Sequence, residues 1–215
     1  AQHTFAMLFY LLEKLPYYDR YVKDEKYIGD KMFTHFDKHF GELAKMTWGI
    51  IGLGNIGRRV ADIAKAFGCR VIYYSTSGRN SQPGYERVSF EELLKESDIV
   101  SVHAPLDENT LDLMNKEAFH QMKKTAIFLN LGRGPIVVEE DLAEALEQGE
   151  IAAAGLDVLR VEPMSPENPL RRIKDSEKLL ITPHIAWASV EARTRLMEII
   201  CGQIQEFFSN GSPES

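Results

Sequence analysis

Apolar residues occur in two alternating patterns along this chain of 215 residues. Short, nearly continuous apolar runs, typical of parallel strands that are covered on both faces, predict strands at residues 48–51, 70–75, 99–103, 126–130, 152–156 and 179–181. Helical spacing between these runs predicts helices at residues 56–67, 90–95, 116–122 and 141–147, with a last helix from about 189 to 208. Repeated strand–helix units predict an α/β fold with a doubly wound parallel sheet.

Two local sequence signals support the predicted helix boundaries. Ser89 and Glu92 form a capping box ahead of an apolar pair. Gly149 lies where the helix at residues 141–147 would end, and glycine is the residue that most often terminates a helix in the left-handed conformation.

The first 46 residues lie outside this repeating pattern. Apolar residues on one face predict a helix over residues 1–15, Pro16 interrupts it, and a second short amphipathic helix follows. Residues 24–46 are polar with scattered aromatic side chains and predict an extended arm. We expect the aromatic faces of this region to serve packing or a dimer contact.

The junction between the first predicted strand and helix carries Gly52, Gly54 and Gly57, at the spacing Gly-x-Gly-x-x-Gly. A strand, a glycine turn and a helix in this order predict a dinucleotide-binding site. Gly52 would permit the tight turn, Gly54 would let a diphosphate approach the backbone, and Gly57 would let helix and strand pack closely. The helix N-terminus would face the phosphates. The alternative is a glycine-rich turn without a function.

Composition narrows the class of protein. Hydrophobic residues make up 44% of the chain and charged residues 27%, so we expect a packed core. The net charge of −7 argues against nucleic-acid binding. The longest apolar run, residues 5–12, is too short to span a membrane and lacks the flanks of a signal peptide.

The cysteines and histidines give no sign of a disulfide or a metal site. Cys69 and Cys201 lie far apart without Cys-x-x-Cys spacing, so reduced thiols in a cytoplasmic protein are expected. The six histidines show no paired ligand spacing, so we expect no bound metal.

Three further blocks follow the glycine turn. They are Asn130-Leu131-Gly132-Arg133-Gly134, then Gly155-Leu156-Asp157-Val158 leading to Glu162-Pro163, and finally Thr182-Pro183-His184-Ile185-Ala186. With the glycine turn, these blocks resemble the D-isomer-specific 2-hydroxyacid dehydrogenases, most closely the glycerate dehydrogenase/hydroxypyruvate reductase members. The resemblance covers essentially the whole chain and implies an oxidoreductase of the NAD(P)-dependent D-2-hydroxyacid dehydrogenase type.

The resemblance also implies a domain arrangement. Residues 1–46 would form a crossover helix and dimerisation arm, residues 47–187 a Rossmann-type NAD(P)-binding domain, and residues 188–215 a return helix. In this family the cofactor domain is inserted into a substrate domain built from both chain ends. Because the chain begins at Ala1 inside a predicted helix, we expect most of the substrate domain to be missing and the fragment alone to have doubtful activity.

The implied reaction is hydride transfer between a nicotinamide and C2 of a small acid, such as hydroxypyruvate/D-glycerate or glyoxylate/glycolate. His184 is the expected proton donor in reduction and acceptor in oxidation, because imidazole titrates near neutral pH. Glu162 would hydrogen-bond the other ring nitrogen, and Arg133 would bind the substrate carboxylate with two hydrogen bonds. The alternatives are a structural histidine, a solvated loop carboxylate and a surface arginine.

The resemblance implies a further set of cofactor contacts. They are Asn55 and Ile56 at the diphosphate, His103, Pro105 and Thr110 near the adenine, Leu131 and Arg133 beside the nicotinamide ribose, and Asp157 at the carboxamide. A turn-forming aspartate is the alternative for Asp157. Trp187 is expected to line the substrate pocket and to favour a small substrate, with a core tryptophan as the alternative.

The end of the second predicted strand departs from the usual pattern of NAD-binding proteins. Proteins that prefer NAD usually place an acidic residue there for the ribose 2′-hydroxyl. This chain has Ser75 and a hydroxyl-rich loop that leads to Arg79. Such a loop removes the repulsion of a 2′-phosphate and supplies a cation, so we expect NADPH to be accepted, in place of or beside NADH.

Two classes of function stay open from the sequence. The favoured one is an enzyme that binds NAD or NADP and a small-molecule acid, assembles as a homodimer, and has no nucleic-acid or membrane partner. The other is a dinucleotide-responsive corepressor on the same fold, which could keep Arg133, Glu162 and His184.

Overall fold

A computed structural model describes residues 1–79 and 81–209. Contacts within the chain divide it into two units, Ala1–Pro183 and His184–Ser215. The first unit contains the whole sheet and the helices that cover it. The domain boundaries expected from the sequence stay a prediction.

In the described part of the chain, the sheet has seven strands in the order β3-β2-β1-β4-β5-β6-β7. The strands are β1 (Thr47–Ile51), β2 (Arg70–Tyr74), β3 (Glu86–Arg87), β4 (Ile99–Val102), β5 (Ile127–Asn130), β6 (Ala153–Leu156) and β7 (Leu179–Ile181). All neighbouring pairs are parallel. The doubly wound parallel sheet is therefore confirmed, with every predicted strand within a residue of its observed ends. β3 was not predicted, because it is short and both of its residues are charged.

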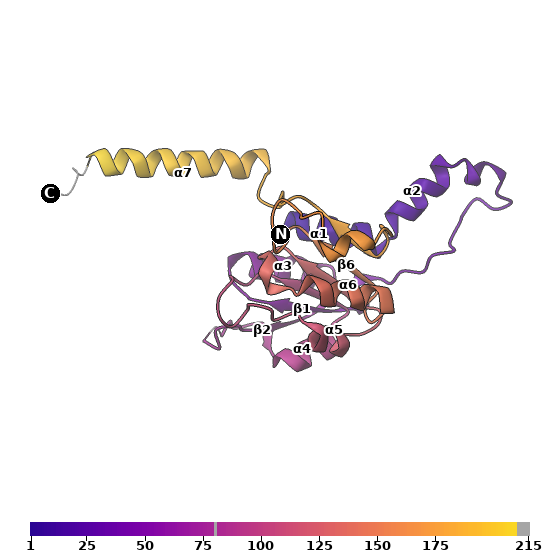
Figure 1. Cartoon of the computed structure of the whole chain (residues 1–215), viewed down its shortest axis with the longest axis horizontal. Coiled ribbons are helices and arrows are strands. Elements are labelled where there is room, and N and C mark those ends of the chain that lie inside the picture. Colours follow the sequence, from indigo (N-terminus) through magenta and orange to yellow (C-terminus); the bar gives the residue numbers. More distant parts are fainter. Residues whose placement is uncertain (80, 210–215) are drawn as a thin grey trace. The chain divides into compact units, whose positions relative to one another are not determined.

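Helices cover both faces of this sheet (Figure 1). One face carries α1 (Gln2–Leu12) and α3 (Asn55–Ala66), whose buried residues share one apolar cluster with the sheet. The other face carries α4 (Phe90–Glu96), α5 (Lys116–Gln121) and α6 (Glu139–Gln148), which share a second cluster. The sheet thus separates two apolar layers, as expected for parallel strands that are buried on both faces.

The helices between the strands begin and end close to their predicted residues, except that α6 begins earlier than predicted. The side chain of Ser89 accepts a hydrogen bond from the N–H of Glu92, 3.1 Å away, and Gly149 ends α6 with φ = 69°. α6 begins at Glu139, two residues before the predicted start at 141. Its first turn is acidic, and carboxylates stabilise the positive end of a helix dipole, so the polar residues ahead of the apolar ones are already helical.

The apolar face of the first helix serves the core of the first unit. Phe5, Leu8 and Leu11 of α1 are buried, and the ring of Phe5 lies 4.9 Å from that of Trp48 on β1. By contrast, α2 (Leu15–Lys23) contains no buried residue. Between α2 and β1 the chain forms only two short 3₁₀ turns in the described region, Lys26–Gly29 and Leu43–Lys45, in keeping with the predicted arm.

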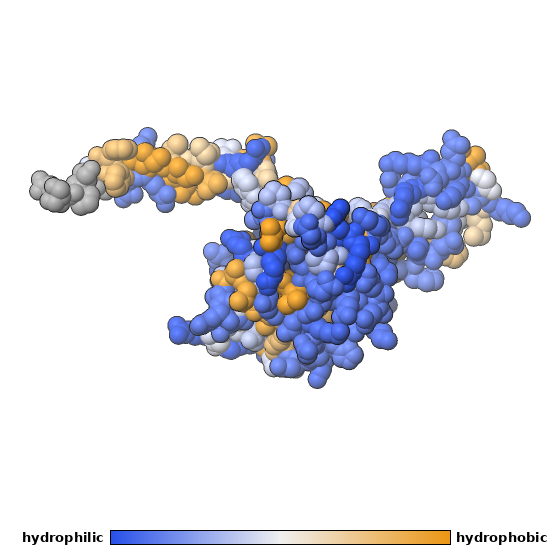
Figure 2. Space-filling model, viewed as in Figure 1, coloured by the Kyte–Doolittle hydropathy of each residue, from blue (hydrophilic) through white to orange (hydrophobic). Residues whose placement is uncertain are grey.

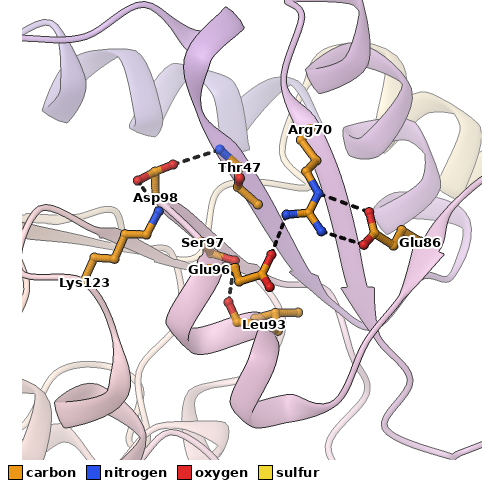
Figure 3. Close-up of polar contacts among 8 residues, drawn as sticks. All are labelled: Thr47, Arg70, Glu86, Leu93, Glu96, Ser97, Asp98 and Lys123. Atoms are coloured by element: carbon orange, nitrogen blue, oxygen red, sulfur yellow. Dashed lines mark hydrogen bonds and ion pairs between the residues drawn. The ribbon is translucent and has the colours of Figure 1, made fainter.

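Charged side chains are paired with one another at the amino edge of the sheet, where the strands begin (Figure 3). Arg70 donates to the carboxylates of Glu86 and Glu96. Asp98 accepts 2.9 Å from the N–H of Thr47 and 2.8 Å from the ammonium group of Lys123. At this edge, therefore, these charged side chains and the N–H of Thr47 have their partners within the chain.

The second unit consists mainly of α7 (Val190–Ser209). The hydroxyl oxygen of Ser189 accepts from the N–H of Ala192, 3.2 Å away, which caps the start of the helix. Apolar side chains occur along its whole length (Figure 2), among them Leu196, Met197, Ile200, Ile204 and Phe207. Within residues 1–79 and 81–209, no helix meets the length and hydropathy needed to span a bilayer.

Candidate active site

The glycine turn lies at the carboxyl edge of the sheet, directly after β1. Gly52 has φ = 89°, and a Cβ there would lie 2.7 Å from backbone atoms of Ala104. A Cβ on Gly57 would lie 2.3 Å from the carbonyl oxygen of Gly52. Both positions therefore need glycine, one for its conformation and the close strand after it, the other for close packing of α3 on the turn.

Gly54 lies in open space, unlike its two neighbours in the turn. A Cβ at this position would meet no atom within 4 Å. Gly54 is also the N-cap of α3, and no side chain caps the helix. The next residue, Asn55, has its Oδ1 occupied by Arg58, 2.6 Å from Nη2. The start of α3 thus offers uncapped N–H groups beside free space, which fits a diphosphate.

The loop after β2 begins with the buried hydroxyl of Ser75, which is 4% exposed. Arg79 lies in the same loop and is exposed to solvent. Asn80, the last residue of this predicted loop, lies outside the described residues. A buried neutral hydroxyl therefore occupies the place where a carboxylate would hold a ribose 2′-hydroxyl.

Two further arginines reach this loop and were not singled out from the sequence. Arg58 of α3 extends Nη1 to 3.5 Å from Oε1 of Gln82. Arg87 of β3 donates from Nη2 to the carbonyl oxygen of Gly78, 2.9 Å away. Both come from elements that flank the loop. For Arg58 the available signal was its place directly after the last glycine of the turn.

The loop after β4 is held in shape by Thr110. This residue is fully buried, its hydroxyl donates to the carbonyl oxygen of Pro105, 2.8 Å away, and it accepts from the N–H of Asp107 at the same distance. His103 opens the loop, and its N–H donates to Ile51 at the end of β1, 2.8 Å away. Pro105 and Thr110 therefore fix the loop beside the glycine turn, and their contact with an adenine stays a prediction.

A row of polar side chains runs under the glycine turn from β1 to His103. Trp48 donates from Nε1 to Oγ of Ser101, 2.8 Å away, and Nε2 of His103 lies 3.1 Å from the same oxygen. Trp48 and Ser101 are fully buried. Burial lowers the pKa of His103 from its usual 6.5 to about 3, so its imidazole is neutral at physiological pH.

The turn after β5 places Leu131 and Arg133. Asn130 is fully buried and closes this turn with both ends of its amide, donating to the carbonyl oxygen of Arg133, 2.9 Å away, and accepting from Gly132, 3.0 Å away. Arg133 is exposed, and its Nη1 donates to the carbonyl oxygen of Gly132. A turn closed by Asn130 thus presents the guanidinium group at the carboxyl edge of the sheet.

The turn with Arg133 touches the loop with Glu162. A Cβ on Gly134 would lie 1.9 Å from the carbonyl oxygen of Leu159, so the two backbones are in direct contact there. The carboxylate of Glu162 accepts from the N–H of Leu159, 2.8 Å away. The first unit therefore brings the loops of these two predicted catalytic residues together.

Asp157 follows β6 and is 1% exposed. Its Oδ1 accepts from the hydroxyl of Thr182, 2.6 Å away. The hydroxyl oxygen lies 3.0 Å from Nε2 of His3, which is itself 3.4 Å from Oδ1 of Asp157. His3 was not singled out, because it lies 179 residues from Thr182 in the sequence. Two side chains thus hold the carboxylate of Asp157, and its contact with the nicotinamide carboxamide stays a prediction.

His184 is the first residue of the second unit. Its φ is 54°, a left-handed conformation that is uncommon outside glycine and that concentrates at functional positions. Trp187 follows in the same unit with 52% of its surface exposed, so it is not a core tryptophan within that unit. The meeting of His184 with Arg133 and Glu162, and the place of Trp187 in a substrate pocket, stay predictions.

Comparison with known proteins gives one matching family model. The model of the D-isomer specific 2-hydroxyacid dehydrogenase, NAD binding domain, matches residues 5–186. The chain is 38% identical to the hydroxypyruvate reductase of Blautia hydrogenotrophica, over 99% of this chain and 66% of that protein. It is 39% identical to the glyoxylate reductase of Korarchaeum cryptofilum, over 96% of this chain and 62% of that protein.

Two solved structures have a similar fold. The D-lactate dehydrogenase of Aquifex aeolicus, complexed with NAD and lactic acid, matches with a TM-score of 0.87 and 28% identity, over 97% of this chain and 66% of that one. The acyclic imino acid reductase Bsp5, in complex with NADPH and D-arginine, matches with a TM-score of 0.84 and 30% identity, over 97% and 64%. The chain therefore spans between 62% and 66% of the length of these four relatives.

Proposed function

Because the chain belongs to the D-isomer specific 2-hydroxyacid dehydrogenases by its NAD-binding domain, we propose that it is the cofactor-binding part of an enzyme that interconverts a small 2-keto acid and a D-2-hydroxy acid. The observation that carries the proposal is the glycine turn. Gly54 faces open space at the uncapped start of α3, where a dinucleotide diphosphate fits.

The reaction needs a hydride, a proton and a fixed substrate. When bound, the reduced nicotinamide supplies the hydride to C2 of the keto acid. His184 gives the proton to the keto oxygen, so that the carbonyl becomes a hydroxyl group. Arg133 binds the substrate carboxylate, and Glu162 stabilises the protonated form of His184 and fixes the orientation of its ring.

Asp157 is the residue we assign to the nicotinamide carboxamide. Its side chain is buried, and its Oδ1 accepts from the hydroxyl of Thr182. Thr182, which directly follows β7, and His3 of α1 hold it in one orientation. Such support fixes an acceptor before the cofactor arrives, which lowers the entropic cost of binding.

We propose that NADPH is accepted by this site, in addition to or in preference to NADH. In the loop after β2, Ser75 stands where an acidic residue would favour NADH, and Arg79 lies in the same loop. Arg58 and Arg87 add positive charge, because each donates a hydrogen bond to a residue of this loop. One similar solved structure holds NAD and another holds NADPH, which supports testing both cofactors.

Hydroxypyruvate and glyoxylate are the substrates we propose to test first. They are the compounds after which the two similar proteins from Blautia and Korarchaeum are named, and a bulky Trp187 would favour a small substrate. Both named relatives are reductases, which favours the enzyme over the corepressor.

A homodimer is proposed from the arm between α2 and β1. This segment exposes large apolar side chains, with Phe33 at 92% of its surface. The others are Tyr27, Ile28, Met32, Phe36 and Phe40. Exposed apolar groups gathered on one segment favour an interface, and light scattering of the purified protein reports the oligomeric state. A cytoplasmic location stays a prediction from the cysteines.

The activity is tested by following loss of NADH or NADPH absorbance with hydroxypyruvate and with glyoxylate, in the full-length protein. We expect His184→Ala to lower kcat by about 100-fold or more, the usual contribution of a general acid. His120→Ala is the matched control, because His120 is exposed on α5 and pairs only with Glu150 in the described structure. Equal turnover of His184→Ala and the parent protein would remove His184 from the mechanism.

A further inference from the structure

The hydrogen-bonded row beneath the glycine turn starts with a group that can only donate. The indole N–H of Trp48 has no acceptor capacity, so Oγ of Ser101, 2.8 Å away, must accept from it. Ser101 lies within β4 and is fully buried. Its own hydroxyl proton therefore needs an acceptor within the protein, because a buried donor without one is costly.

His103 is the acceptor that the structure offers. Among residues 1–79 and 81–209, the hydroxyl of Ser101 has two hydrogen-bond partners, Trp48 and Nε2 of His103. Since Trp48 cannot accept, Ser101 donates to Nε2 across 3.1 Å. A neutral imidazole that accepts at Nε2 carries its proton on Nδ1. Burial, which lowers the pKa of His103 to about 3, keeps the ring neutral.

The backbone of His103 adjoins the glycine turn, where the dinucleotide is proposed to bind. His103 directly follows β4, and its N–H binds Ile51, the last residue before the glycine turn. Its neighbour Ala104 is the residue that a Cβ on Gly52 would strike. The ring is half-buried, and in the described part of the chain Nδ1 has no partner.

We propose that His103 is a donor of fixed tautomer, whose Nδ1–H binds an acceptor atom of the dinucleotide, and that Trp48 and Ser101 are the positioning residues that set this tautomer. The inference rests on the proposed dinucleotide site and goes beyond it by placing the imidazole proton of His103 on Nδ1. A donor whose proton is fixed in advance needs no rearrangement when the cofactor binds.

The tautomer is tested first, by long-range ¹H–¹⁵N NMR of the full chain with labelled histidine. The signal of His103 is assigned by its loss in His103→Asn. We expect the Nδ1–H form in the parent protein and a mixture of both tautomers in Ser101→Ala, which removes the hydroxyl proton. A parent protein with the proton on Nε2, or a tautomer that Ser101→Ala leaves unchanged, overturns the proposal. This arm needs neither cofactor binding nor catalysis.

The role of the proton is tested by a matched pair of variants. The amide of Asn in His103→Asn lies near the former Nδ1 and keeps a donor there, whereas the longer Gln in His103→Gln carries its amide towards the former Nε2. We expect His103→Gln to raise the Kd for NADH and for NADPH about fivefold, the size of one net hydrogen bond, and His103→Asn to raise it less than about twofold. His120→Gln, an exposed histidine on α5, is the control and should leave both Kd values unchanged.

The outcomes separate this inference from the proposed function. Equal Kd values for His103→Gln and the parent protein, measured by titration of the bound cofactor's fluorescence, overturn the role of the Nδ1 proton while the dehydrogenase stands. A parent protein that binds neither NADH nor NADPH overturns the dinucleotide site and the ligand assigned to His103 with it. Normal binding without turnover contradicts only the proposed reaction.

Discussion

At its amino edge the sheet pairs exposed charged side chains with one another, whereas at its carboxyl edge it buries polar side chains and glycines. Arg70 and its two glutamates are about half exposed at the amino edge. At the other edge, Ser101, Asn130 and Asp157 are almost completely buried, and each has its hydrogen bonds within the chain. The polar side chains of the amino edge are thus in contact with water, whereas those of the carboxyl edge are shielded from it.

This difference decides which edge can select a ligand. Exposed ion pairs are screened by water and contribute little to stability, so they tolerate change. Buried polar groups lose much more when a partner is removed, and their donors and acceptors keep fixed directions. Fixed groups beside open space, as at Gly54, suit the binding of a cofactor. The comparison therefore makes three predictions, from the largest effect to the smallest.

The largest effect is expected from Gly57→Ala at the carboxyl edge. Its Cβ would lie 2.3 Å from a backbone oxygen of Gly52, so α3 and the turn must move apart. We expect a loss of about 3 kcal/mol in the free energy of unfolding, as for overpacked sites, together with loss of NADH and NADPH binding. Urea unfolding and cofactor titration measure the two effects.

Gly54→Ala is the matched control for Gly57→Ala, because a Cβ on Gly54 meets nothing in the chain. Alanine is a poorer N-cap, so we expect a cost of about 1 kcal/mol or less. The added methyl group would meet a diphosphate, so the Kd for the cofactor should rise more than about tenfold. Unchanged binding in a folded Gly54→Ala protein would show that no diphosphate approaches this position.

The second prediction concerns the pH dependence that the buried His103 imposes. The pKa of this imidazole falls from 6.5 to about 3 in the folded chain. Between these values the unfolded chain binds a proton that the folded chain does not, so stability falls as the pH falls through this window. Near pH 5 the loss due to His103 amounts to about 2 kcal/mol relative to neutral pH.

His103→Asn isolates this term, because asparagine does not titrate. Urea unfolding of both proteins near pH 5 and near pH 8 should give a smaller fall in stability for the variant than for the parent protein. The carboxylates are common to both proteins and cancel in the difference. An identical fall in the two proteins would mean that folding does not lower the pKa of His103.

The sheet and its glycine turn could be predicted from the sequence because both depend on local patterns. Apolar runs of the right length indicate buried strands, and the spacing of Gly52, Gly54 and Gly57 indicates a turn between strand and helix. The structure confirms these strands. The other site residues of the first unit were assigned through the family resemblance, and the pattern of parallel strands adds only that strands ending at one edge bring their following loops together.

The supporting residues could not be predicted, because they depend on strand register and on contacts far apart in the sequence. Ser101 interrupts an apolar run and gives no sign of Trp48, which lies 53 positions away on the neighbouring strand β1. His3 meets Thr182 only once α1 lies on the sheet. β3 forms from two charged residues that pair with β2, a tertiary contact that no local pattern indicates.

The smallest effect is expected from Arg70→Gln at the amino edge. The carboxylates of Glu86 and, after it, Glu96 raise the pKa of Arg70, and Arg70 in turn lowers that of Glu86, yet all three groups lie in contact with solvent. We expect a slight fall in Tm that shrinks as salt is added, because ions screen exposed charges.

The amino edge lies about 15 Å from the glycine turn, the length of a strand of this size, so the Kd of Arg70→Gln for NADPH should change less than about twofold. Thermal unfolding at low and high salt, together with cofactor titration, measures both effects. A large loss of cofactor affinity would mean that the two edges are coupled through the strands, and the contrast between a tolerant edge and a selective one would no longer hold.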